Sequence, residues 1–439
     1  MFNSISHYTK IFDKINSGCN IDVVYLDFAR AFDKVDHIIL LKKANDLKIN
    51  GKLLDWLKCF LTKRTQAVVL EGFQSREEPV VSGVPQGTVL APLLFLIMIN
   101  DLPNALKHCS LSSFADDTKI VKTIRDITDH LLMVEDLNRI YRWSEENKLP
   151  FNCNKFTLIQ YKTKKSQVSP DYHYNAPDGN IIEKEDNVKD LGIIMSSSLS
   201  FKDHISYIVS KCKQLIGWIF RTFKSRDKLT MLTLWKSLVL SRLDYCSQLW
   251  SPVKIGEMQE IEGLQRTFTN CISGVTNLDY WDRLSNLHLY SIERRFERYL
   301  IIYAWKIIEK KVVNPDTFTE SDIDSRTGRK FGFIQSKSNE TKKNSTYDSP
   351  FNRAKTAFNS LPKELRNITN VGADNFKTQL DRFLSKIPDQ PNVPGYKKFR
   401  ACATNSIWDQ FQHLEMGGNA VGAPASALSQ ETLSTRRWN

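Results

Sequence analysis

The segment IDVVYLDF, residues 21–28, constrains the fold of this chain more than any other. It is short, rich in β-branched residues and almost continuously apolar, which is typical of a strand buried at the centre of a sheet. Asp27 stands near its end, where such a strand reaches the edge of the core. We therefore expect a sheet in the first half of the chain, with a carboxylate at the end of a central strand.

The rest of residues 1–200 mixes helical and extended patterns. We expect helices over residues 37–51 with Gly51 as the C-cap, over 53–61, over 88–101 and over 127–147. Pro92 fits only the first turn of its helix. The apolar face of the last helix is traced by Ile127, Leu131, Val134, Leu137 and Tyr141.

Extended segments fill the space between these helices. Strands are expected in QAVVLEG, EEPVV, KFTLIQY and DLGIIM, and SGVPQG is a loop. The acidic pair Asp116–Asp117 has short apolar runs on both sides, which predicts a tight β-hairpin.

The second half changes character and is mostly helical. A long amphipathic helix is predicted by the apolar stripe Ile205, Ile208, Val209, Cys212, Leu215, Ile216, Ile219, Phe220 and Phe223. Further helices are expected over residues 229–245, 258–272, 291–310 and 374–385. The polar stretch 314–350 is expected to be a linker or disordered loop, and the small-residue tail from 417 to be disordered.

Length and composition set the broad class. A chain of 439 residues with 41% hydrophobic and 25% charged residues is expected to fold into two or three globular domains. No apolar run reaches the roughly 18 residues of a membrane span, and no secretory signal is present. We expect an intracellular protein, in the nucleus or cytoplasm, that is neither secreted nor bound to a membrane.

Cysteine spacing argues against a zinc module and against a disulfide framework. Eight cysteines are scattered, and the two nearest in sequence, Cys246 and Cys271, are far beyond CxxC spacing. Isolated cysteines such as Cys212 are most simply reduced residues of the core.

The positive charge is concentrated in the second half. Residues 1–200 hold 25 Lys and Arg against 25 Asp and Glu, whereas residues 201–439 hold 36 against 24, so the second half carries the whole net charge of +12. This imbalance favours a polyanionic partner, although many soluble proteins are mildly basic.

Three carboxylates are the candidates for chemistry. If the strand ending near Asp27 lies beside the hairpin that carries Asp116 and Asp117, the three carboxylates converge, and hard divalent cations such as Mg²⁺ relieve their repulsion. Two such ions support phosphoryl transfer. An Asp-Asp pair alone is more often only a turn.

The segments around these residues decide between the two interpretations. YLDFARAFDKVDH (25–37) resembles reverse transcriptase motif A of LINE-type, jockey-like non-LTR retrotransposons, SGVPQGTVLAPLLFLIMINDLP (82–103) resembles motif B, and FADDTKI (114–120) resembles motif C. NCNKF (152–156) is similar to motif D, and residues 188–205 are similar to motif E with the start of the thumb. The resemblance covers about residues 20 to 400.

The resemblance implies a role for each matching residue. Asp27, Asp116 and Asp117 would be the catalytic metal ligands for two Mg²⁺ ions, for which Mn²⁺ could substitute, with Asp117 the weakest. Phe32 would exclude the 2′-OH of a ribonucleotide and so select dNTPs. The alternative is that Phe32 is a core residue, and both can hold at once. Gln86 and Gly87 would approach the nucleotide, or form an ordinary turn. Lys155 would protonate pyrophosphate or contact a phosphate, although a lysine before a strand commonly faces solvent.

Two further sets of residues would contact the nucleic acid. Leu191 and Gly192 would belong to a primer-grip hairpin, although a glycine bulge needs no such role. Five basic residues would track the RNA–DNA duplex, or form only a solvated rim: Lys202, Lys211, Lys213, Arg221 and Lys224. The implied partners are an RNA template, a DNA primer, their duplex and dNTPs.

The fold class that follows is α+β. It is a right-hand polymerase palm, an antiparallel sheet packed on helices, followed by a mostly helical thumb and C-terminal region. We divide the chain into a palm (1–187), a primer-grip hairpin and thumb (188–312), a polar linker (313–350), a small helical segment (351–400) and a disordered tail (401–439).

The expected function is RNA-directed DNA polymerase activity by two-metal nucleotidyl transfer. Asp27 of motif A stands only 26 residues after Met1, where the family has a fingers region, so we expect a truncated product with little activity. A non-catalytic nucleic-acid-binding remnant of a retroelement is the alternative. A group II intron maturase is another alternative, but the tail of motif B (residues 88–103) resembles LINE elements more closely. An RNA-dependent RNA polymerase would usually have Gly where Ala115 stands, and Phe32 favours deoxynucleotides.

Overall fold

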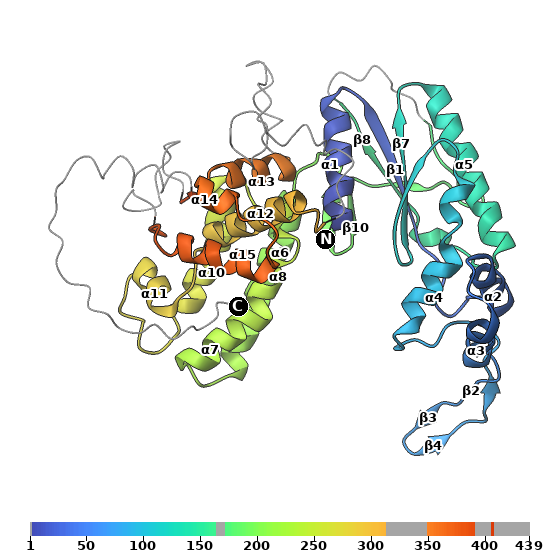
Figure 1. The fold of residues 1–439 in the computed structure, drawn as a ribbon, viewed down its shortest axis with the longest axis horizontal. Coiled ribbons are helices and arrows are strands. Elements are labelled where there is room, and N and C mark those ends of the chain that lie inside the picture. The colour runs from blue at the N-terminus through green and yellow to red at the C-terminus, as the bar shows by residue number, and fades with distance from the viewer. Residues whose placement is uncertain (1, 164–171, 313–348, 391–404, 408–439) are drawn as a thin grey trace. The chain divides into compact units, whose positions relative to one another are not determined.

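The computed structural model describes residues 2–163, 172–312, 349–390 and 405–407 (Figure 1). The chain divides into two compact units. The sheet unit comprises Ile11–Ser200, and the helical unit comprises Met1–Lys10 with Phe201–Asn439. Residues 188–200, which the sequence-based division grouped with the thumb, therefore belong to the sheet unit. The first helix, α1 (Phe2–Asn16), contributes residues to both units.

A five-stranded sheet forms the centre of the sheet unit. Its strand order is β6-β7-β1-β8-β9, and the bounds of its strands are β1 Asn20–Leu26, β6 Ser110–Phe114, β7 Asp117–Ile124, β8 Thr157–Tyr161 and β9 Glu183–Lys184. β1 pairs antiparallel with β7 and β8 and is buried along its length, as predicted for a central strand. The prediction of a purely antiparallel sheet was wrong in one respect, because the short edge strand β9 runs parallel to β8.

The predicted helices of this unit are present. They are α2 (His37–Asp46), α3 (Gly51–Leu61), α4 (Leu90–Ile99) and α5 (Ile127–Glu146), with short 3₁₀ turns at Leu102–Ala105 (η1) and Cys153–Lys155 (η2). Asp36 begins α2 by accepting hydrogen bonds from the backbone amides of Ile38 and Ile39 at 2.9 and 3.0 Å. The assignment of Gly51 as a C-cap was wrong. Gly51 instead begins α3, and α2 has already ended at Asp46.

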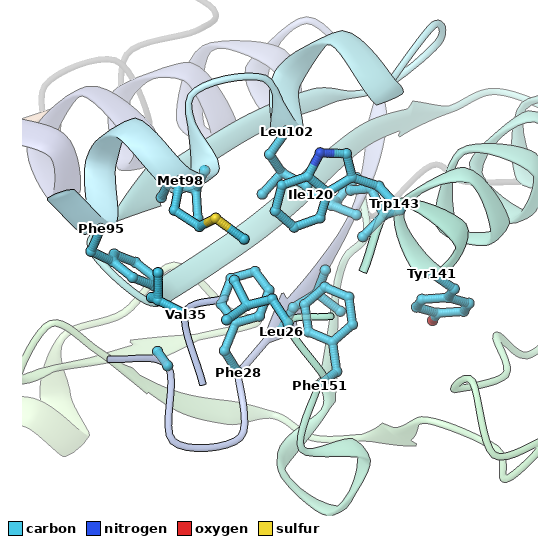
Figure 2. Close-up of a cluster of buried hydrophobic side chains, with 14 of the residues drawn as sticks. Leu26, Phe28, Val35, Phe95, Met98, Leu102, Ile120, Tyr141, Trp143 and Phe151 are labelled. Atoms are coloured by element: carbon cyan, nitrogen blue, oxygen red, sulfur yellow. The ribbon is translucent and has the colours of Figure 1, made fainter. Parts of the chain in front are cut away.

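The helices cover one face of the sheet. Val24 of β1 lies between Ile120 of β7 and Leu158 of β8, and these three side chains enter the same apolar core as Phe95 of α4 and Ile140 of α5. Figure 2 shows this core around Leu26 and Phe28. Phe28 stacks on Phe151 with ring centroids 4.5 Å apart and meets Phe95 edge-on at 6.4 Å.

Phe95 is central to this packing. It is fully buried and also stacks on Phe32, with ring centroids 4.8 Å apart. Truncating a buried phenylalanine to alanine typically costs about 3–5 kcal/mol. Phe95→Ala would therefore loosen the loop that follows β1 as well as the core.

The buried face of α5 differs from the predicted one. Leu137 and Tyr141 are buried as predicted, but Ile127 and Leu131 are exposed, and His130, Met133 and Ile140 take their places. The helical period was right and the phase was partly wrong, because the packing of α5, and not its period alone, decides which residues are buried.

The strand candidates between α3 and α4 form a long, thin hairpin. They pair as four strands of two residues each: β2 (Thr65–Gln66), β3 (Val69–Leu70), β4 (Phe73–Gln74) and β5 (Glu78–Pro79). Figure 1 shows β3 and β4 extending away from the rest of the sheet unit. Val69, Leu70 and Phe73 are consequently exposed.

A separate two-stranded hairpin ends the sheet unit. β10 (Asn187–Asp190) and β11 (Ile193–Ser196) pair with each other, and Leu191 and Gly192 form the turn. The segment DLGIIM (190–195), where a strand was predicted, thus contains the last residue of β10, the turn and the first three residues of β11.

The second half of the chain is mostly helical, as predicted. Its helices, in chain order, are α6 (Lys202–Thr222), α7 (Lys228–Leu234), the π-helical η3 (Trp235–Leu240), α8 (Ser241–Asp244), α9 (Ser247–Trp250), α10 (Ile255–Thr269), α11 (Tyr280–Leu287), α12 (Ile292–Ile308), α13 (Pro350–Asn359), α14 (Lys363–Arg366) and α15 (Ala373–Leu384). The stripe of α6 is buried through Ile205, Val209, Cys212, Ile216 and Ile219. The seven cysteines within the described ranges are free thiols.

Some expectations fall outside the described residues. The predicted linker lies outside the described residues from 313 to 348, as does most of the expected tail 401–439. α13 begins at Pro350 and was not anticipated individually. Every helix in the described part of the chain is too short or too polar to cross a bilayer.

Candidate active site

Strand register brings the three predicted carboxylates to one end of the sheet. Leu26 of β1 pairs with Thr118 of β7, so Asp27, the next residue, comes level with Asp117. β6 and β7 form the predicted tight hairpin, with Phe114 paired to Asp117 and only Ala115 and Asp116 between them. Asp116 therefore lies at the hairpin tip, beside the residue where β1 ends.

The electrostatics of Asp117 reflect this clustering. The pKa of its carboxyl is raised, first by partial loss of solvent and then by the negative charges of Asp116, Asp190 and Asp27, while Lys119 lowers it. Three of the four carboxylates are those that sequence analysis selected.

Lys155 lies against Asp27. Its Nζ donates a 2.9 Å hydrogen bond to Asp27 Oδ2, and this bond and charge raise the pKa of the lysine, with smaller contributions from Asp116 and Asp117. The backbone holds Lys155 there, because Asn152 donates to the carbonyl of Asp27 at 2.8 Å and Lys155 then closes a turn onto Asn152. The side chain itself is largely exposed to solvent.

Asp33 connects the predicted nucleotide-binding residues to the loop after β1. Gln86 Nε2 donates a 2.7 Å hydrogen bond to Asp33 Oδ1, and Ser82 Oγ donates to the Asp33 carbonyl at 2.9 Å. Gly83 has a φ of +87°, and a Cβ there would lie 2.8 Å from the Asp33 carbonyl oxygen. Only glycine fits at position 83 without displacing this loop.

Phe32 lies in the loop after β1, and Gln86 and Gly87 lie in the loop before α4. Phe32 is half-buried, with its ring packed on Phe95. Gly87 and Gln86 are exposed, and Gly87 has a φ of +81°, which favours glycine.

The β10–β11 hairpin and the strand ends enclose a pocket of about 140 Å³. Asp27, Asp117 and Lys155 line one side, and Asp190 and Leu191 of the hairpin line the other. Leu191 and Gly192 both have left-handed backbones, with φ of +47° and +87°. Gly192 tolerates this conformation easily, whereas Leu191 does not.

The sequence comparison identifies this fold unit. Residues 7–195 match the family described as "Reverse transcriptase (RNA-dependent DNA polymerase)". Residues 7–195 are a reverse transcriptase domain. The match covers all three carboxylates, Lys155 and the β10–β11 hairpin, and it confirms the resemblance on which the site residues were chosen.

The domain is related to those of non-LTR retrotransposons. The chain is 28% identical over 263 residues to "RNA-directed DNA polymerase from mobile element jockey" of Drosophila melanogaster, covering 57% of this chain and 28% of that protein. It is 26% identical over 273 residues to "Probable RNA-directed DNA polymerase from transposon X-element" of the same species, covering 60% and 29%. The chain thus spans less than a third of the length of these two relatives.

A solved structure also aligns with the chain. Apo telomerase from Candida tropicalis matches with a TM-score of 0.38 and 14% identity, over 65% of this chain and 48% of that one. This likeness is too weak to carry conclusions about the reverse transcriptase domain.

The carboxylates of the reverse transcriptase domain are donors of the kind that a divalent metal takes. Polymerases of this family generally use a divalent metal. Among the described residues, no group of three or more His, Cys, Asp or Glu side chains is gathered closely enough to hold an ion. Carboxylate oxygens are nevertheless the donors that Mg²⁺ prefers, and the charges of Asp116 and Asp27 raise the pKa of the Asp117 carboxyl, after the larger effect of its burial.

Sequence reasoning missed Asp190 and Lys119. Both are buried, and the Lys119 ammonium donates to Asp190 Oδ2. No local signal marked them, because β7 also carries Asp117 and Lys122 and β10 also carries Asn187 and Lys189, so neither charge stands out among apolar neighbours. Asp33 lies within motif A but was not among the predicted site residues, and its bond to Gln86 gives it a specific structural role.

The five basic residues predicted to meet nucleic acid lie in the helical unit. All are exposed, and those of α6 spread over the part of the helix that turns away from its buried stripe. Lys213 lies 3.4 Å from Glu260 Oε1, and Lys211 lies 5.9 Å from the ring of Tyr207. They form a basic surface and not a single narrow row.

Proposed function

We propose that this domain is the palm of a right-hand polymerase that catalyses RNA-directed DNA synthesis, adding dNTPs to a primer 3′-OH on an RNA template. The observation that carries the proposal is the convergence of Asp27, Asp116 and Asp117 at one end of the β1–β7 pair. Family membership supports the reaction class, and the carboxylates supply the charge that such a reaction needs.

Asp27, Asp116 and Asp117 would hold two Mg²⁺ ions, or Mn²⁺ in their place. When bound, such ions lower the pKa of an attacking hydroxyl and neutralise charge on the leaving pyrophosphate. Asp27 would have to release the Lys155 ammonium, and the largely exposed lysine is able to move. Asp117, whose charge is opposed by three other carboxylates, would be the weakest ligand.

Lys155 would then act on the pyrophosphate leaving group. A lysine ammonium keeps its proton at neutral pH, and Lys155 stands beside the carboxylates that the triphosphate would approach. From there Nζ can contact a phosphate or donate a proton to pyrophosphate.

Phe32, Gln86 and Gly87 would form the nucleotide side of the site. Phe32 is held by the buried ring of Phe95, so its exposed edge is rigid enough to exclude a 2′-OH. Gln86 is already oriented by Asp33, and Gly87 lets the backbone come close to a nucleotide.

Leu191 and Gly192 would contact the primer end, and the basic residues of the helical unit would bind the duplex. The hairpin tip shares a pocket with Asp27 and Asp117, which is the placement a primer terminus requires. Exposed lysines and arginines bind phosphates with little sequence preference, as a thumb must.

Primer extension on poly(rA)/oligo(dT) with Mg²⁺ tests the proposal. Whatever extension the wild-type chain supports should be abolished by Asp116→Ala and left unchanged by Asp55→Ala, which removes an exposed carboxylate on α3. Equal activity of the wild type and Asp116→Ala would exclude this site. Titration of Mn²⁺ against the wild type and Asp27→Asn provides a second readout, because the variant should bind the ion more weakly.

A non-catalytic nucleic-acid-binding protein is the second candidate. Two observations favour it: the basic surface of the helical unit, and the absence of closely gathered metal ligands among the described residues. It predicts salt-dependent duplex binding that Asp27→Asn does not change, without extension under conditions in which the duplex is bound.

A further inference from the structure

A buried ion pair joins two elements of the reverse transcriptase domain that share no backbone pairing. Lys119 of β7 donates through Nζ to Asp190 Oδ2 of β10, and each side chain is only 4% exposed. The ammonium also lies 5.9 Å from the centre of the Tyr25 ring. Neither Lys119 nor Asp190 belongs to the carboxylate set proposed to bind metal.

The β10–β11 hairpin depends on side chains for its position. It forms its own two-stranded sheet, separate from the five-stranded one, and each of its strands has only four residues. Isolated hairpins are marginally stable in water. Ile193 and Met195 bury the hairpin against the unit, but apolar contacts are non-directional and set its position only loosely.

The ion pair is directional, and it therefore fixes the position of the hairpin more closely than the apolar contacts do. Lys119 follows Asp117 by two residues on a strand, so both side chains point to the same face of the sheet. Asp190 directly precedes the turn of Leu191 and Gly192. The bond between Lys119 and Asp190 therefore sets the separation between the carboxylate end of β7 and the hairpin tip.

Stability alone does not account for this pair. Removing two charges from water is costly, and replacing a buried ion pair by apolar residues of similar volume is often neutral or stabilising. Apolar residues would therefore serve equally well if the hairpin only had to be attached. A charged pair in this place is better explained by a need for one defined position.

We propose that Lys119 and Asp190 are a positioning pair that holds the β10–β11 hairpin in register with Asp117, so that a primer end bound at Leu191 and Gly192 faces the metal-binding carboxylates. This inference rests on the proposed polymerase function. Neither residue touches the reacting atoms, and both act through the hairpin.

Four variants test the pair. Lys119→Met and Asp190→Asn each break it, and the double variant Lys119→Met/Asp190→Leu replaces it by an apolar contact. The control is Lys122→Met, since Lys122 lies on the same strand and pairs with Asp129 at 3.3 Å with low exposure of both side chains, away from the pocket. Extension kinetics are measured with primer–template and dNTP varied separately.

We expect both single variants to raise the KM for primer–template by about tenfold or more, which is about 1.4 kcal/mol, and to change the KM for dNTP by less than about twofold. The control should leave both constants unchanged. The double variant should recover the thermal stability of the wild type without recovering the primer KM. Recovery of both, or a primer KM unchanged in the single variants, overturns the proposal.

A second readout separates this inference from the proposed function. Hydrogen exchange of the amides of residues 187–196 should be faster in Lys119→Met and in the double variant than in the wild type and Lys122→Met. If the wild-type chain extends no primer, the proposed function fails, while faster exchange still supports a hairpin positioned by the pair. Unchanged exchange in the double variant overturns the positioning role whatever the activity. If the single variants do not fold, the primer KM and the hydrogen exchange are both measured on the double variant.

Discussion

Gln86 Nε2 lies 2.7 Å from Asp33 Oδ1, so a residue of the loop after β1 orients the side chain predicted to meet the nucleotide. The neighbouring backbone holds the same two loops together, because Val84 donates to the Phe32 carbonyl at 2.9 Å and Gly83 donates to that of Val35 at 2.8 Å. The orientation of Gln86 is thus established before any nucleotide binds.

Asp33→Ala should weaken nucleotide binding without slowing the chemical step. Freeing Gln86 removes one hydrogen bond and the order it provides, so we expect the KM for dNTP to rise about three- to tenfold, equivalent to roughly 0.7–1.4 kcal/mol, with kcat little changed. Steady-state extension with varied dNTP measures this. Gln86→Ala should have the same effect, and the double variant should add little to it. A drop in kcat at constant KM would contradict the explanation.

Much of this site was predictable because its signals are local. The apolar run before Asp27 predicted a central strand, and the short apolar flanks of Asp116–Asp117 predicted the hairpin. Once both elements were strands of one sheet, the carboxylates had to approach at its edge. The resemblance of the surrounding segments to reverse transcriptase motifs then assigned their chemistry.

The remaining features depend on contacts that no local pattern contains. Asp190 meets Lys119 across 71 positions of sequence, and Asp33 meets Gln86 across 53. The exposed Ile127 and Leu131 show the same limit for the fold, because the period of α5 is visible in the sequence but its rotation about its axis depends on its packing. Gly51 could cap one helix or begin the next, and only packing decided between the two.

Leu191→Asn should make the protein more stable and a poorer polymerase. Leu191 has a φ of +47°, a conformation that Asn tolerates better, so relief of strain should add about 1 kcal/mol to the free energy of unfolding. Leu191 also lines the pocket with Asp27, so its loss should raise the KM for primer–template. Urea unfolding and primer titration measure the two effects.

Lys48→Asn is the matched control for Leu191→Asn. Lys48 also has a left-handed backbone, with a φ of +68°, but it follows α2 and does not line the pocket. It should gain stability without any change in primer KM. If Leu191→Asn gains stability and keeps the wild-type primer KM, the leucine is not part of a primer grip.

Removing basic residues of the helical unit should weaken duplex binding in a salt-dependent way. Replacing Lys211, Lys213 or Arg221 by alanine should lower the slope of log K against log salt by about 0.7–0.9 for each phosphate that the protein no longer neutralises. Fluorescence anisotropy of a labelled RNA–DNA duplex over a salt series measures the slope. Lys377→Ala on α15, a partly exposed lysine that lies 3.0 Å from Asp374, is the control and should leave the slope unchanged.

The helical unit should lose stability as pH rises, because it buries a carboxyl group. Glu262 of α10 accepts hydrogen bonds from the Tyr280 hydroxyl and from the Ile292 amide, the latter at 2.8 Å. Burial, aided by the nearby charges of Asp389 and Glu293, raises its pKa to about 8.

The sign of the effect follows from the raised pKa. The folded protein holds this proton more tightly than the unfolded chain, so the stability from Glu262 is fully present below its ordinary pKa of 4.5 and is lost as pH rises through about 8. The loss is at most about 1.4 kcal/mol per pH unit between these values. Glu262→Gln carries no proton equilibrium and should remove this dependence.

Calorimetric unfolding of the wild type and Glu262→Gln between pH 5 and pH 9 measures the difference. Because glutamine can still accept from the Ile292 amide, the variant should match the wild type near pH 5 and unfold at a higher temperature near pH 9. Glu260→Gln, an exposed neighbour on the same helix, should follow the wild type throughout. Parallel pH curves for the wild type and Glu262→Gln would mean that the buried carboxyl ionises in the folded protein near its ordinary pKa.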